Sequence, residues 1–248
     1  MYVTQGLTDV GSCRSQNQDV FAAESVSGLG LVAVVCDGMG GAKAGDVASA
    51  ATRDTIFDTL RDERLRDGKT SIGELLRIAL DRANAYVCRQ AGIEEAYVGM
   101  GTTAVIAVVR DGSACIANVG DSRAYWIGPD SIRQITRDHS IVQYLMDMGQ
   151  ITPSEAMLHP KRNVITRAIG ADTEVEADLF DLPLEGGTLL LCTDGLSGTV
   201  PAEMIAAAVR EDPKEAPRKL IRMALDMGST DNVTALVVYD DRKEVTHG

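Results

Sequence analysis

Three apolar segments that meet an aspartate at one end constrain this chain more than any other feature of its sequence. LVAVVC and TLLLC are typical of buried strands, and they lead to Asp37 and Asp194. NVTALVVY has the opposite order, because it begins directly after Asp231. If this last strand runs antiparallel to the other two, the three aspartates meet at one edge of a sheet.

A fourth aspartate can join this group. Asp121 stands in the predicted turn between strands 113–119 and 122–127. Carboxylates gathered in one place repel each other unless cations neutralise them, and oxygen-only ligands favour Mg²⁺ or Mn²⁺. Two such ions can together activate a water molecule and stabilise a leaving oxygen in phosphoryl chemistry. An Asp-Gly pair after one strand is usually only a turn, so the prediction rests on the joint pattern.

The glycines after the first of these strands fit a metal site. Gly38, Gly40 and Gly41 surround Met39 in the stretch DGMGG. Without side chains, the backbone can turn sharply beside an ion, and the Gly38 carbonyl can itself be a ligand.

The arrangement of predicted elements indicates antiparallel sheets. Helices occur in pairs between groups of strands, which disfavours a parallel, doubly wound sheet and favours an α+β fold with helices packed outside. The sequence shows no repeat and no linker, so we expect a single domain over residues 1–248. The predicted strands are 1–10, 19–27, 29–36, 102–109, 113–119, 122–127, 188–192 and 232–239. The predicted helices are 43–60, one that begins at Ser71 with a capping box to Glu74, 201–210 and 214–227.

Residues 137–165 differ from the rest of the chain. They are polar, rich in methionine and interrupted by Pro153 and Pro160, and TPSE at 152–155 predicts the start of a short helix. A segment this long is unusual as a simple connection within a compact domain. It therefore indicates a functional flap, which we place at about 140–165.

Composition excludes several classes of protein. The 248 residues have a formal net charge of −12 and no basic cluster, so nucleic acid is not expected as a partner. No apolar run is long enough to cross a membrane, and the first residues do not resemble a signal peptide, so we expect a cytoplasmic protein without a membrane partner. Cys36 and Cys115 lie in apolar runs and are expected to be reduced core residues. A monomer is the default expectation.

Eight motifs together resemble the type 2C (PPM) family of metal-dependent Ser/Thr protein phosphatases, in its compact bacterial form. The resemblance runs from about Thr8 to Tyr239, with each motif weak alone and the ordered set highly specific. The motifs are GSCRSQNQD (11–19), DGMGG (37–41), GTTAV (101–105), GDSRAY (120–125), RDHS (137–140), TRAIG (166–170), CTDGL (192–196) and TDN (230–232).

The resemblance implies a four-layer α-β-β-α sandwich, in which two antiparallel sheets are flanked by pairs of helices. It also implies two Mn²⁺ or Mg²⁺ ions in a core site. Asp37, Asp194 and Asp231 would hold the first ion, and Asp37 would bridge to the second with help from the Gly38 carbonyl. Asp121 with Asp194 matches the site of a third ion in bacterial members.

Residues around the implied ions are also assigned by resemblance. Arg14 matches the arginine that binds the substrate phosphate, and Asp19 is expected to order water at the metal site. Gln18 stands where many members have Glu, and Asn232 follows the last ligand as a supporting residue. Met39 replaces a His that some members use as a candidate general acid, so the proton donor to the leaving group stays open.

His139 is the remaining candidate for an acid. A lone histidine in a loop motif more often makes structural hydrogen bonds, and its geometry is the deciding test.

The resulting hypothesis is hydrolysis of phosphoserine and phosphothreonine on proteins, opposing a Ser/Thr kinase or acting on its targets. One alternative is a pseudophosphatase that binds phosphoproteins without turnover. Another is a two-metal hydrolase of nucleotides or phosphodiesters. The physiological substrate and the choice between Mn²⁺ and Mg²⁺ are not readable from the residues.

Overall fold

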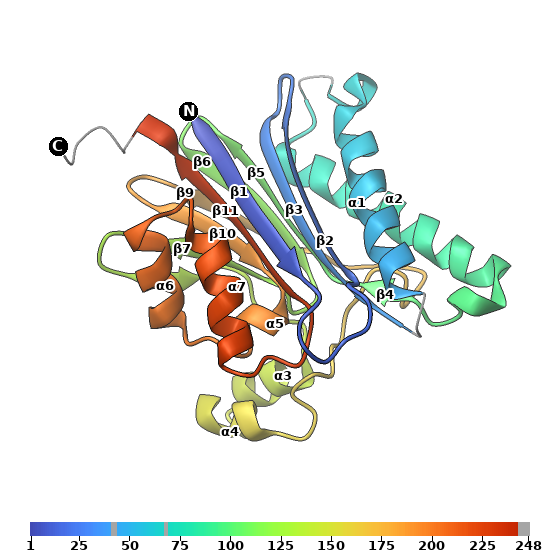
Figure 1. Cartoon of the computed structure of the whole chain (residues 1–248). Coiled ribbons are helices and arrows are strands. Elements are labelled where there is room, and N and C mark those ends of the chain that lie inside the picture. The colour runs from blue at the N-terminus through green and yellow to red at the C-terminus, as the bar shows by residue number, and fades with distance from the viewer. Residues whose placement is uncertain (41–43, 67–68, 243–248) are drawn as a thin grey trace.

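Two antiparallel β-sheets form the middle of the structure and pack face to face (Figure 1). The computed structural model describes residues 1–40, 44–66 and 69–242. The first sheet has the order β1-β11-β10-β7-β8, and its strands are β1 (Tyr2–Asp9), β11 (Val233–Asp240), β10 (Thr188–Cys192), β7 (Arg123–Ile127) and β8 (Ile132–Gln134). The second has the order β2-β3-β5-β6-β9, with β4 paired to β3, and its strands are β2 (Asp19–Val26), β3 (Gly30–Met39), β4 (Gly101–Thr102), β5 (Ala104–Arg110), β6 (Ser113–Val119) and β9 (Asp178–Pro183).

Helices cover both outer faces of the pair of sheets (Figure 1). Those on the second sheet are α1 (Gly45–Arg61) and α2 (Ile72–Ile93), and those on the first are α5 (Asp194–Ser197), α6 (Ala202–Glu211) and α7 (Ala216–Asp226). The predicted four-layer sandwich is confirmed. Two further short helices, α3 (Ile141–Asp147) and α4 (Pro153–Leu158), lie together at one end of the sandwich, and two 3₁₀ turns are Glu63–Leu65 and Glu95–Tyr97.

Strands in the centre of each sheet are apolar on both faces because both faces are covered. In β3, Val34 and Cys36 pack toward the helices α1 and α2, whereas Val35 packs toward the other sheet. In β10, Leu190 faces the helices and Leu191 faces the other sheet. Because successive side chains of a strand point to opposite faces, one continuous apolar run contributes residues to two separate cores.

The predicted elements are close to those observed. Asp111 and Gly112 both have positive φ values, +49° and +80°, so the predicted hairpin between β5 and β6 has the conformation that Asp-Gly favours. Ser71 caps α2 by accepting from the Glu74 backbone N–H at 3.2 Å. The expected start of α1 at Lys43 lies outside the described residues, and α1 is helical from Gly45.

The sequence did not predict β4, β8, β9, α3 or α5. The strand β9 reads DLFDLP, with two aspartates and a proline, and it lies at the edge of its sheet beside β6. An edge strand needs fewer apolar residues than a central one, so its signal is weak. The others have seven residues or fewer.

One expectation about the sheets was wrong. We expected Asp37, Asp194 and Asp231 at one edge of a single sheet, but β3, which carries Asp37, belongs to the second sheet. β10 and β11 do pair antiparallel in the first, with Cys192 opposite Ala235. The aspartates therefore approach from two facing sheets, because β3 belongs to one sheet and β10 and β11 belong to the other.

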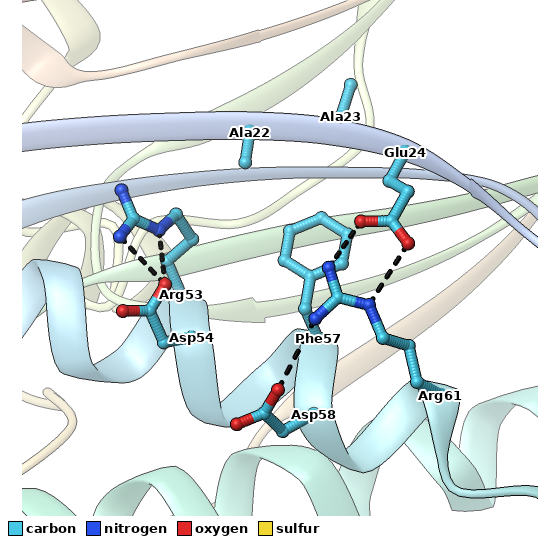
Figure 2. A pocket seen from close by; sticks show the side chains of 8 residues that line it. All are labelled: Ala22, Ala23, Glu24, Arg53, Asp54, Phe57, Asp58 and Arg61. Atoms are coloured by element: carbon cyan, nitrogen blue, oxygen red, sulfur yellow. Dashed lines mark hydrogen bonds and ion pairs between the residues drawn. The ribbon is translucent and has the colours of Figure 1, made fainter.

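An ion pair between Arg61 and Glu24 connects α1 to the edge strand β2 (Figure 2). Arg61 donates from Nε to Glu24 at 3.0 Å and also contacts Asp58 at 3.3 Å. Its guanidinium lies 5.4 Å from the centre of the Phe57 ring. These side chains border a small pocket on the outer surface, lined also by Ala22 and Ala23.

None of the helices in the described part of the chain combines the length and apolar character needed to span a bilayer.

The layer between the sheets predicts the effect of a core substitution. Leu191 is fully buried there, so Leu191→Ala should lower the free energy of unfolding by about 2–5 kcal/mol through lost burial and a residual cavity. Met204→Ala on α6 is the control, because Met204 is 43% exposed and its loss should change stability by less than about 0.5 kcal/mol. Urea unfolding followed by circular dichroism measures both, and equal effects would contradict the assignment of this layer as a core.

Candidate active site

The ends of the central strands open into a pocket of about 610 Å³. Asp121, Asp194 and Asp231 line it, from the β6–β7 turn, the start of α5 and the residue before Asn232 and β11. Asp37 is close enough to Asp194, Asp121 and Asp231 for their carboxylates to raise its pKa. The structure thus brings together the four aspartates that the sequence singled out.

Burial and crowding disfavour negative charge on this group. Burial raises the pKa of Asp37 well above its usual range, and the neighbouring carboxylates of Asp19 and Asp194 raise it further. Burial and then Asp194 raise the pKa of Asp121 to about 8. The pKa of Asp194 is raised by burial and by Asp231. So many carboxylates can all be ionised at neutral pH only if cations offset their repulsion.

The donor set fits hard divalent cations. Asp194 Oδ1 is buried and has no hydrogen-bond partner among the described residues, as expected for an oxygen reserved for another ligand. All four side chains offer only oxygen, which suits Mg²⁺ and Mn²⁺.

Arg14 forms an ion pair with Asp231, one of the four aspartates. Its Nη2 donates to Asp231 Oδ2 at 2.7 Å, with the two side chains 53% and 32% exposed. Within the described residues, no three acidic, histidine or cysteine side chains already surround one point as they would a bound ion.

The backbone at Asp37 is fixed by two threonines that the sequence analysis did not single out. Thr102 Oγ1 and the Thr103 N–H donate to the Asp37 carbonyl at 2.8 and 2.9 Å. The Asp37 N–H donates to Thr103 Oγ1 at 2.9 Å, and this hydroxyl shares a 2.7 Å hydrogen bond with Ser122. Asp37 and the turn that carries Asp121 are therefore connected through Thr103. The motif GTTAV was the available signal for this role.

Gly38 occupies a place where no side chain fits. A Cβ there would lie 2.1 Å from the Gly45 carbonyl oxygen and 2.7 Å from the Gln18 carbonyl oxygen. The Gly38 N–H donates to that Gln18 oxygen at 3.1 Å. The close approach explains the first glycine of DGMGG. Gly40 has a φ of +141°, and Gly41 lies outside the described residues.

Asp19 links the two sheets behind the pocket. It pairs with Asp37 in the β2–β3 register, and its Oδ2 accepts from the hydroxyls of Thr193 and Thr234 at 2.8 and 2.7 Å. Burial raises its pKa to about 7, against the effect of these two hydrogen bonds. Its other oxygen, Oδ1, is buried and has no partner in the described chain. That free oxygen is available for the water that Asp19 was expected to order.

Asn232 positions the loop that carries Arg14. Its Oδ1 accepts from the Gln18 N–H at 2.8 Å, and its Nδ2 donates to the carbonyls of Val10 and Gln16 at 2.8 and 3.0 Å. All of its side-chain hydrogen bonds are thus made to the backbone of the N-terminal loop.

His139 uses both ring nitrogens within the structure. Its Nδ1 accepts from the Gly120 N–H at 3.1 Å, and the backbone N–H of His139 donates to the Gly120 carbonyl at 2.9 Å. Its Nε2 lies 3.3 Å from Asp178. Because Nδ1 is an acceptor, the proton lies on Nε2 and points to Asp178. This geometry favours the structural interpretation, in which His139 holds the residue before Asp121.

Comparison with known proteins agrees with this geometry. Residues 12–235 match the family model described as Protein phosphatase 2C. The chain belongs to the protein phosphatase 2C family. This phosphatase is 35% identical over 237 residues to "Serine/threonine phosphatase stp" of Listeria monocytogenes, covering 94% of each chain. It is 37% identical over 244 residues to "Protein phosphatase PhpP" of Streptococcus pneumoniae, covering 94% of this chain and 95% of that one.

Solved structures give the same assignment. The crystal structure of the serine/threonine phosphatase Stp1 from Staphylococcus aureus has a TM-score of 0.91 and 39% sequence identity, covering 97% of this chain and 96% of that one. The catalytic domain of the serine/threonine protein phosphatase PstP, in complex with two manganese ions, has a TM-score of 0.84 and 32% identity, covering 96% of this chain and 97% of that one. The chain is thus a protein-serine/threonine phosphatase, and its family is metal-dependent.

The Thr103 connection predicts a selective effect of removing one hydroxyl. Thr103→Val leaves the Asp37 N–H and Ser122 without their partner, so it should lower the free energy of unfolding by about 1–3 kcal/mol. It should also weaken Mn²⁺ binding, because Asp37 is no longer held in place. Urea unfolding and titration calorimetry with Mn²⁺ measure the two effects.

Thr52→Val is the matched control. Thr52 is also fully buried, but its hydroxyl has no hydrogen-bond partner among the described residues. Its removal should leave stability unchanged or raise it, and should not affect Mn²⁺ binding. If the two variants behave alike, the connection through Thr103 does not hold the site.

Proposed function

We propose that this phosphatase hydrolyses phosphoserine and phosphothreonine on proteins in a reaction that requires two divalent metal ions. The observation that carries the proposal is the crowding of Asp37, Asp121, Asp194 and Asp231, whose ionisation needs compensating cations. The names of the relatives support the substrate class, and the two manganese ions of the PstP structure support the metal. Oxygen ligands accept both Mn²⁺ and Mg²⁺, so either can serve.

The proposed ligands are those that the motifs of the phosphatase family imply. Asp37, Asp194 and Asp231 would hold the first ion, Asp37 and the Gly38 carbonyl the second, and Asp121 with Asp194 a third. When bound, the ions supply Lewis-acid activation of water and offset charge on the phosphoryl oxygens. Asp19 would hold the attacking water through its free Oδ1.

Arg14 would bind the substrate phosphate after leaving Asp231. An exposed ion pair contributes only about 0–1 kcal/mol, so exchanging Asp231 for a phosphate has a small energetic cost. The planar guanidinium can then make two parallel hydrogen bonds to phosphoryl oxygens. Asn232 is the residue that keeps its loop in place for this contact.

No side chain in the described site is assigned as the acid for the leaving oxygen. Met39 has no proton to give, and both nitrogens of His139 are engaged elsewhere. We propose that a water molecule in the site donates this proton.

We further propose that residues 1–248 act as one catalytic domain, with residues 140–165 as a flap beside the pocket. Val142, Met146 and Met157 of this segment line the pocket, which supports its role as part of the site. A bacterial Ser/Thr kinase or its targets would be the source of substrate. Cytoplasmic location and a monomeric state stay predictions.

Replacing one ligand tests the site. Asp231→Asn should lower kcat/KM by about 100-fold or more, because the amide removes one of the charges that bind the ion. Its fold should remain, as judged by circular dichroism and urea unfolding. Asp226→Asn on α7 is the control, since Asp226 is 69% exposed and, among the described residues, pairs only with Arg222. Full activity of Asp231→Asn would remove Asp231 from the proposed ligands.

Dependence on metal tests the reaction. Release of phosphate from a phosphothreonine peptide should require Mn²⁺ or Mg²⁺ and should stop when EDTA is added. Para-nitrophenyl phosphate should be cleaved far faster than its diester, bis(para-nitrophenyl) phosphate. Preference for the diester would favour a phosphodiesterase. A folded protein that binds Mn²⁺ but releases no phosphate would instead be the phosphoprotein-binding alternative.

A further inference from the structure

Part of the lining of the pocket at the strand ends is apolar. Val142, Met146 and Met157 line it from the flap, and Val200 and Pro201 line it from the corner between α5 and α6. We call this region the flap groove. It belongs to the same 610 Å³ pocket as Asp194 and Asp231, so it is continuous with the proposed reaction site.

Two charged residues of the pocket lining, Arg123 and Asp138, are paired with each other. Arg123 donates from Nη2 to Asp138 at 2.6 Å, and from Nη1 to the Tyr125 hydroxyl at 2.9 Å. The remaining charged residues of the lining, Arg162 and Glu203, are exposed and have opposite signs. The groove therefore offers apolar contact without a strong preference for either charge.

The flap also exposes an unusual share of apolar side chains. Of the twelve large hydrophobic residues exposed in the described chain, five lie within 140–165, a segment of 26 residues. They are Tyr144, Met148, Met157, Leu158 and Val164. Met157 is 72% exposed although it lines the pocket, so its apolar surface is available to a ligand. Methionine is flexible and adapts to side chains of different shape.

We propose that the flap groove binds an aliphatic side chain that lies close in sequence to the phosphorylated residue of the substrate. This inference rests on the proposed function, because the substrate must place its phosphate at the carboxylates. An extended peptide advances about 3.3 Å per residue, so neighbours within three positions lie within about 10 Å of the phosphorylated residue. The enzyme would thus distinguish phosphoproteins by an apolar neighbour as well as by the phosphate.

A set of peptides tests the preference. Each contains one phosphothreonine, with Leu or Ala placed in turn at the three positions on either side. At one position or more, kcat/KM should be about tenfold higher with Leu than with Ala, as for a modest apolar contact in an open groove. Equal values at every position would overturn the inference, as would a higher kcat/KM with Ala than with Leu.

A pair of flap variants assigns the preference to the groove. Met157→Gln keeps a side chain of similar length but makes it polar, so the Leu-to-Ala ratio should fall to about twofold or less. The ratio cancels any general change in activity. Leu158→Gln is the matched control, because Leu158 is the next residue, is 85% exposed and does not line the pocket. It should keep the tenfold ratio, and an equal loss in both variants would overturn the assignment.

Failure of the proposed function has a different signature. Wild-type protein with Mn²⁺ and para-nitrophenyl phosphate tests the reaction without the groove, because this substrate has no flanking residues. If that hydrolysis is absent, binding of the same peptides carrying a fluorescent label tests the groove. Tighter binding of the Leu peptide supports it, and equal binding overturns it.

Discussion

Mutual repulsion among buried carboxylates is the constraint around which this end of the sandwich is built. Asp37, Asp121 and Asp194 are close enough for each to be affected by the charge of a neighbouring carboxylate, and Asp121 approaches from the β6–β7 turn. Such a cluster opposes folding unless protons or cations offset its charge. The surrounding sheets must therefore be stable enough to hold the residues in place, which the two-sided apolar strands β3 and β10 provide.

Hydrogen bonds from threonines hold the acidic residues in fixed positions on these sheets. Thr102 and Thr103 hold the backbone of Asp37, while Thr193 and Thr234 hold the carboxylate of Asp19. Asp19 belongs to one sheet, whereas Thr193 directly follows β10 and Thr234 lies in β11 of the other sheet. The site thus lies where the sheets are joined by polar contacts as well as by the apolar layer between them.

Much of this arrangement was readable from the sequence. Apolar runs ending at aspartates, together with the order of motifs, predicted the sandwich and gathered Asp37, Asp121, Asp194 and Asp231. The period of two cannot show which sheet a fully buried strand joins, so Asp37 was placed in the wrong one. Short and edge strands such as β9 carry too few apolar residues to be recognised. The roles of Thr103 and Thr193 depend on contacts between distant segments, which no local pattern contains.

The ion pair between Arg14 and Asp231 has a consequence for how ligands influence one another. While the pair is formed, Asp231 Oδ2 accepts from Arg14, so this oxygen and this part of the guanidinium are less available to other ligands. A cation that draws Asp231 away would leave Arg14 free for an anion, and an anion that draws Arg14 away would leave Asp231 free for a cation. Under the proposed roles, binding of metal and of phosphate is therefore thermodynamically coupled, and each increases the affinity for the other by the same factor.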